Sequence, residues 1–212
     1  MANVNLARKY WGKAWEYYFD GECDRAIAAG RKAMELNPAF ARVHWVIGNA
    51  FLWREPRGHV ERELAIKEFR QLIEKEPRWA PGYAALGGAL MQQGRLAEAL
   101  KSYSEALRLN PQQLGVRIPL AQLWLKRNDY REAIRVLRGI DSPCTTSIDA
   151  YLLLTRAMAQ DFVNHGRAEI RAAWEHILSF DESIPANRAA IAEARQELEK
   201  LRPEELFRKR ET

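Results

Sequence analysis

Apolar positions along the chain recur three and four residues apart, which is the spacing of one face of an α-helix. Two such stripes lie on either side of Gly94, and Pro111 ends the second stripe because proline cannot continue a helix. The clearest stripes are formed by Tyr83, Leu86 and Leu90, and then by Ala99, Tyr103 and Ala106. No run of alternating polar and apolar residues is long enough to predict a strand. The pattern therefore predicts pairs of helices joined by short turns.

This two-helix pattern repeats along the chain. Prolines that follow a helical stretch stand at Pro38, Pro77 and Pro111, 39 and then 34 residues apart. A recurrence of this size indicates an array of supersecondary units. Five extra residues around Arg54 to Gly58 account for the longer first interval.

The segment 83–111 resembles a tetratricopeptide repeat (TPR), in which an aromatic residue and a Leu-Gly pair on one helix face Ala, an aromatic and Pro on the next. Gly87 and Ala99 are small, so the paired helices can approach closely, and Gly94 can adopt the positive φ of a tight turn. The resemblance implies an all-α fold, a right-handed α-solenoid of antiparallel helix pairs. We expect a single TPR-like domain over residues 1–212, with repeats at about 7–40, 41–79, 80–113, 114–146 and 147–182.

Two parts of the chain depart from the repeat pattern. Pro119 stands inside the first helix of the fourth repeat, so we expect that helix to start late or to be kinked. Residues 185–201 carry apolar positions at helical spacing and are predicted to form a capping helix over the last pair. Residues 202–212 are predicted to be a tail.

Catalytic and metal-binding patterns are missing from the sequence. The hydrophobic fraction of 47% fits a globular chain and excludes disorder as the dominant state. The four histidines form neither a His-Glu-x-x-His motif nor an i, i+4 pair, and His44 falls in a core position of the second repeat. Cys144 stands in a Ser/Thr-rich connector without the context of a nucleophile. We therefore predict no enzymatic activity, no cofactor and no metal.

The sequence gives no indication of a membrane segment or of nucleic-acid binding. No stretch approaches the roughly 18 apolar residues of a membrane span, and the first residues lack a secretory pattern, so we expect a cytoplasmic protein. The net charge is +5, with 33 basic and 28 acidic residues. These charges are interleaved, as in Glu61-Arg62-Glu63, which indicates a solvated mixed-charge surface. A nucleic-acid-associated basic module remains a less favoured alternative.

Aromatic residues near the amino end outnumber the core positions available to them. Tyr10, Ala14 and Tyr17 supply the packing stripe of the first helix, and a second stripe of aromatics is displaced from it by one or two residues. In TPR arrays this second face lines the concave groove, so the resemblance implies a partner-binding groove. The predicted groove residues are Arg8, Trp11, Trp15, Tyr18, Phe19, Arg42, Trp45, Asn49, Leu52, Trp53, Met91, Gln122 and Arg156.

Six open aromatic side chains in this groove would exceed the largest apolar patch of a typical monomer, about 300–600 Å². We therefore predict a non-catalytic scaffold or adaptor that binds a partner peptide or helix, with acidic partner residues toward Arg156. Two alternatives remain: the chain's own N-terminal residues or the 54–58 insertion cover the rings, or a second copy of the chain does, giving a homo-oligomer. Binding of a chaperone tail is not favoured, because Asn49 fits one position of the carboxylate clamp of such TPR domains but Trp15 and Trp45 replace its Asn and Lys.

Overall fold

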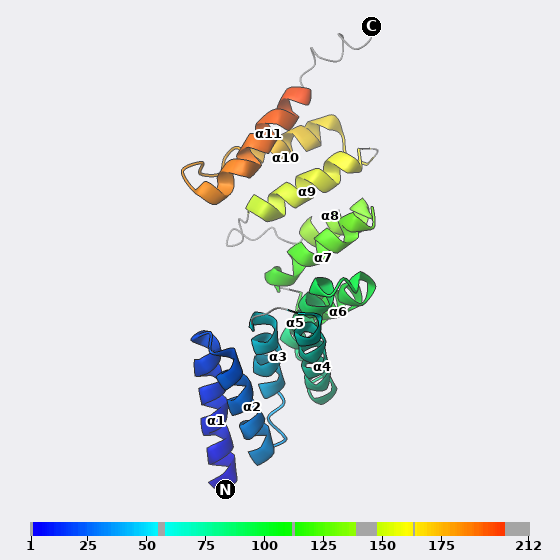
Figure 1. The fold of residues 1–212 in the computed structure, drawn as a ribbon. Helices are drawn as coiled ribbons and strands as arrows, with labels where there is room; N and C mark the ends of the chain where they lie inside the picture. Colours follow the sequence, from blue (N-terminus) through cyan, green and yellow to red (C-terminus); the bar gives the residue numbers. More distant parts are fainter. Residues whose placement is uncertain (1, 55–57, 112, 139–147, 163, 202–212) are drawn as a thin grey trace, which may run out of the picture. The chain divides into compact units, whose positions relative to one another are not determined.

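The computed structural model describes residues 2–54, 58–111, 113–138, 148–162 and 164–201. All regular structure in these ranges is helical, and the chain forms two compact units, residues 1–116 and 117–212 (Figure 1). The tail 202–212 and the connector that holds Cys144 lie outside the described residues.

The first unit contains three helix pairs. They are α1 (Ala2–Phe19) with α2 (Cys23–Leu36), α3 (Val43–Trp53) with α4 (His59–Lys75), and α5 (Ala80–Gln92) with α6 (Leu96–Leu109). Each pair packs on the next through α2 with α3 and through α4 with α5, while α3 also contacts α1 and α5. The predicted all-α fold of successive helix pairs is therefore confirmed.

Small residues and left-handed turn residues make these pairs possible. Ala14 and Ala99 are fully buried, so the backbones of paired helices can lie close together. Gly21 and Gly94, in the turns of the first and third pairs, have φ values of +78° and +80°, and Asn128 has a φ of 57°. Glycine adopts this conformation without steric cost, and asparagine tolerates it better than most residues. The turn predicted at Gly94 is confirmed, and Gly21 and Asn128 form turns of the same kind.

The second unit continues the helical pattern. Its helices are α7 (Leu114–Lys126), within which the boundary between the units falls, α8 (Tyr130–Arg138), α9 (Ile148–Gln160), α10 (Arg167–Ile177), the 3₁₀ turn Pro185–Asn187 and α11 (Arg188–Lys200). A hydrogen bond joins α7 to α8, since Arg117 Nη1 donates to the Val136 carbonyl over 2.7 Å. Of the two expectations for this helix, the late start is wrong, because α7 begins at Leu114 and keeps Pro119 inside it; a kink at Pro119 stays a prediction.

His44 lies in the core of the first unit, as predicted, with a polar partner that the sequence did not reveal. Its ring is buried, and Nδ1 lies 2.7 Å from a carboxylate oxygen of Glu68 on the paired helix. In the described parts of the chain, no three His, Cys, Asp or Glu side chains gather where they could hold a metal ion. None of the described helices has the length and apolar character needed to cross a bilayer.

Alkaline pH should destabilise the first unit through Tyr103, whose ring packs against the backbone at Gly87. Burial raises the pKa of Tyr103 to about 12, above the value near 10 of an unfolded chain. The folded state therefore favours the neutral phenol, and this stabilisation is present below pH 10 and is lost as the pH rises toward 12. Between pH 9 and pH 12, the free energy of unfolding measured with urea should fall by about 2 kcal/mol more in wild type than in Tyr103→Phe. Equal losses in the two proteins would contradict this account of Tyr103.

Candidate partner-binding surface

Aromatic side chains of the first unit gather on the face formed by α1, α3 and the residue before α5. We call this group the aromatic surface, and its members are Trp15, Tyr18, Phe19, Trp45, Trp53 and Trp79. They come from three successive helix pairs and form one connected set of ring contacts.

The rings of the aromatic surface are held in favourable geometries. Trp15 and Trp45 stack with centroids 5.1 Å apart and ring planes at 25°. Phe19 also stacks on Trp15, with ring centroids 5.5 Å apart. Tyr18 meets Trp45 and Trp53 edge-on at 6.1 and 5.9 Å. All these separations lie within the range of attractive aromatic pairs, so the rings hold one another in place.

Part of this surface is anchored in the core. Trp15, Tyr18 and Trp45 are half-buried and pack against a small cluster of buried residues that includes Ala14 and Val46. Burial raises the pKa of the Tyr18 hydroxyl, with a smaller contribution from Cys23. The inner rings therefore belong to the folded unit itself.

The structure corrects the expectation that six rings stay open. Trp11 is also half-buried and lies against Phe40 at 6.2 Å, so most of the rings cover one another. The outer rings differ, because Phe19 is 74% exposed and Trp53 is 60% exposed. The chain encloses neither of these two side chains within its described residues, and they form the accessible edge of the aromatic surface.

A cleft of about 550 Å³ adjoins this edge between α3 and α5. It is lined by Asn49, Leu52, Trp53, Ala85, Gly88 and Gln92. The Asn49 amide nitrogen donates to the Trp45 carbonyl over 2.8 Å, which fixes its side chain beside the rings. Met91, another predicted groove residue, is partly buried on α5. Three of the predicted groove residues, Asn49, Leu52 and Trp53, thus line one cleft together with residues of the next helix pair.

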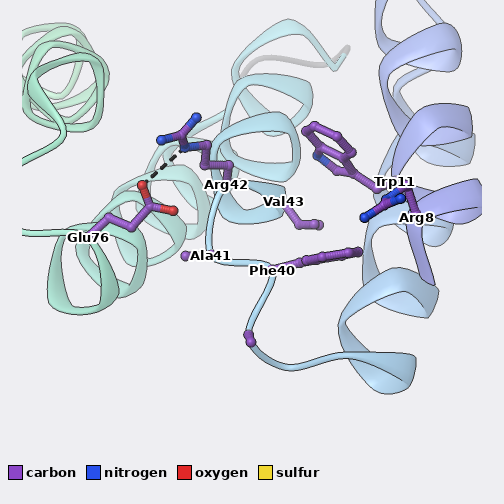
Figure 2. Close-up of a pocket in the computed structure, with 8 residues that line it drawn as sticks. Arg8, Trp11, Phe40, Ala41, Arg42, Val43 and Glu76 are labelled. Atoms are coloured by element: carbon purple, nitrogen blue, oxygen red, sulfur yellow. Dashed lines mark hydrogen bonds and ion pairs between the residues drawn. The ribbon is translucent and has the colours of Figure 1, made fainter. Parts of the chain in front are cut away.

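A second, smaller cleft of about 260 Å³ lies between α1 and the start of α3. We call it the arginine cleft, and its lining residues are Arg8, Trp11, Ala39, Phe40, Ala41, Arg42, Val43 and Glu76. Figure 2 shows Arg8 and Trp11 reaching from α1 toward Phe40, with Arg42 and Glu76 on the other side. Arg42 Nε donates to the Glu76 carboxylate over 3.1 Å. The Arg42 guanidinium also lies 5.2 Å from the centroid of Trp79, which links the arginine cleft to the aromatic surface.

Two tetratricopeptide repeat family models match the chain, over residues 61–113 and 90–143. The structure is similar to that of the MamA protein, with a TM-score of 0.70 and 18% identity over 84% of this chain and 92% of that one. It is also similar to YrrB, described as a TPR protein with an unusual peptide-binding site, with a TM-score of 0.68 and 17% identity over 86% of this chain and 90% of YrrB. The chain contains tetratricopeptide repeats.

A curated relative of this TPR protein is tetratricopeptide repeat protein 21B of Xenopus laevis. The two are 29% identical over 121 residues, which is 52% of this chain. The match spans only 9% of the length of the Xenopus protein.

The remaining predicted groove residues of the TPR protein lie in the second unit. Gln122 is exposed on α7. Arg156 on α9 is held by α11, since its Nε donates to Glu193 Oε1 over 2.7 Å and its Nη2 donates to the other oxygen. The hydrogen bond to Glu193 raises the pKa of Arg156. The expectation that Arg156 holds an acidic partner group therefore needs correction, because the chain's own carboxylate already occupies the guanidinium.

Sequence reasoning missed Phe40 and Trp79, which wall the arginine cleft and extend the aromatic surface. A repeated signal could have found them, because each stands two residues after the proline that ends a repeat, Pro38 or Pro77. These positions lie in the connections between helix pairs, outside the helical stripes that the periodicity shows.

Interleaved charges of this TPR protein pair with one another on its surface. Arg95 bonds to both oxygens of Glu98 and lies 3.4 Å from Glu63, while Arg70 reaches Glu98 from the neighbouring helix at 3.0 Å. The hydrogen bond from Arg95 lowers the pKa of Glu98. Exposed pairs of this kind contribute little stability, but they neutralise part of the basic charge on α4 and α6.

Proposed function

We propose that this chain is a non-catalytic scaffold that binds a partner polypeptide at the aromatic surface and the cleft beside it. One observation carries the proposal: Phe19 and Trp53 remain exposed at the edge of a ring cluster that the core already holds rigid. A rigid apolar site loses little conformational entropy on binding, which favours affinity. The cleft between α3 and α5 gives a partner chain space next to these rings.

The exposed rings offer enough apolar area to anchor a partner. A large aromatic side chain buries about 150–250 Å² when fully covered. With exposures of 74% for Phe19 and 60% for Trp53, covering either ring contributes roughly 3 kcal/mol at about 25 cal/mol per Å². Central aromatic anchors of this kind dominate many protein interfaces.

The comparisons support a polypeptide as the class of partner. Proteins of the TPR family are generally repeat scaffolds without catalytic activity, and YrrB is described as having a peptide-binding site. The proposal for this chain adds where the partner binds and which side chains it covers.

The test compares two double variants in affinity purification followed by quantitative mass spectrometry. Phe19→Ala with Trp53→Ala removes the exposed edge of the aromatic surface. Val60→Ala with Phe162→Ala removes side chains that are 65% and 53% exposed elsewhere. We expect at least tenfold lower partner recovery with the first pair and unchanged recovery with the second. Equal recovery with both pairs would overturn the proposal.

Two further measurements complete this test. Circular dichroism and urea unfolding should be the same for both double variants, so that lost recovery reflects binding. Trp15 and Trp45 are unsuitable targets, because they pack on the core. Sedimentation of the purified wild-type chain distinguishes a second copy from a different partner: a dimer that the Phe19 and Trp53 substitutions dissolve would replace the scaffold proposal with self-assembly.

A further inference from the structure

The arginine cleft carries an excess of positive charge. Arg8 and Arg42 both line it, and Glu76 is the acidic residue among its lining residues. The carboxylate of Glu76 is bonded to Arg42. Arg8 is exposed and forms no ion pair or hydrogen bond within the described part of the chain. The cleft therefore presents an uncompensated guanidinium beside an apolar wall.

The same cleft contains a hydrogen-bond donor without an acceptor. Trp11 Nε1 is buried and finds no partner among the described residues. Burial of an unpaired donor has an energetic cost. The exposed Arg8 guanidinium is a charged donor of several hydrogen bonds, and it favours a carboxylate as its partner.

The arginine cleft is continuous with the aromatic surface. Trp11 and Trp15 are one helical turn apart on α1, and the Arg42 guanidinium packs over Trp79. Arg8 precedes Phe19 by eleven residues on α1, which corresponds to about 16 Å along the helix axis. An extended polypeptide covers this distance with about five residues. A single partner segment can therefore reach both places.

We propose that the arginine cleft binds the carboxylate of an Asp or Glu side chain in the partner polypeptide, about five residues from the apolar anchor that covers Phe19 and Trp53. This inference rests on the proposed function and adds the chemistry and spacing of the partner. The Arg8 guanidinium donates hydrogen bonds to the carboxylate, the Trp11 indole and Phe40 ring contact the aliphatic part of the acidic side chain, and Glu76 holds Arg42 in place. The carboxylate-clamp positions at Trp15, Trp45 and Asn49 are not involved.

The test uses displayed random peptides of about 12 residues, selected on the immobilised full chain. The bait proteins are wild type, Arg8→Gln and the matched control Arg31→Gln, which removes an exposed charge from α2 outside the cleft. We expect wild type and Arg31→Gln to enrich apolar residues together with Asp or Glu about five positions away. Arg8→Gln should keep the apolar enrichment and lose the acidic one.

A titration then measures the effect on one selected peptide, synthesised with an amidated carboxyl end so that only its side chains carry carboxylates. Changing its acidic residue to the amide should weaken binding to wild type about three- to tenfold and leave binding to Arg8→Gln nearly unchanged. Acidic enrichment that persists in Arg8→Gln would overturn the inference. Apolar enrichment without acidic residues in wild type would also overturn it, but would leave the proposed function intact. Loss of all apolar enrichment in wild type would overturn both.

Discussion

Replacing Gly48 with Ala should lower the free energy of unfolding of the first unit by about 1–3 kcal/mol. A Cβ atom at this position would lie 2.5 Å from Cε1 and 2.8 Å from Cζ of Phe69. Phe69 is fully buried, so its ring cannot move aside without disturbing the core between α3 and α4. The cost of overpacking should exceed the higher helix propensity of alanine. Urea unfolding followed by circular dichroism measures the difference.

The matched control is Gly12→Ala on α1. A Cβ atom there meets nothing within 4 Å, so only helix propensity acts, and the variant should be more stable than wild type by up to about 1 kcal/mol. The two glycine-to-alanine changes should therefore have opposite signs. If Gly48→Ala were as stable as Gly12→Ala, the close approach of α3 and α4 at Gly48 would be contradicted.

Replacing Trp45 with Ala should cost about 2–4 kcal/mol of stability, whereas Trp53→Ala should cost less than about 1 kcal/mol. The Trp45 ring stacks on Trp15 and contacts Tyr18 and Trp79, and it packs on buried residues, so its removal leaves a gap in a connected cluster. Trp53 is 60% exposed and touches the cluster at Tyr18. Urea unfolding of the two variants, each compared with wild type, measures both effects.

This comparison separates structural rings from rings available to a partner. The Trp53→Ala variant should keep the unfolding midpoint close to that of wild type while partner recovery falls. If Trp53→Ala lost as much stability as Trp45→Ala, Trp53 would be needed for the fold. Its exposure would then not support a role in binding.

The helices could be predicted from the sequence because an apolar stripe is a local property of a few consecutive turns. Gly94 could be placed in a turn for the same reason, since the tolerance of a positive φ depends on the residue itself. Pro119 does not delay the start of α7, because the proline lies five residues after the helix begins at Leu114. Local pattern and local conformation therefore gave most of the fold.

The candidate surface was only partly predictable. Trp15 and Trp45 could be assigned to one face of their helices. Their stacking at 5.1 Å depends on how α1 and α3 pack together, since the two tryptophans are 30 residues apart in the sequence. The bond between Arg156 and Glu193 joins α9 to a helix outside the repeat pattern, so no repeat alignment could reveal it. Contacts between distant segments decided which rings stay exposed and which charges are already compensated.

Photo-cross-linking at position 19 tests most directly whether the aromatic surface binds a partner. The full chain carries benzoylphenylalanine in place of Phe19, or of Phe162 as a control for another exposed phenylalanine, and is irradiated in its native cells. We predict a discrete adduct with a different polypeptide at position 19, lost when Trp53→Ala is added, and no such adduct at position 162. The same adducts at both positions, or an adduct at position 19 that persists without Trp53, would contradict the account.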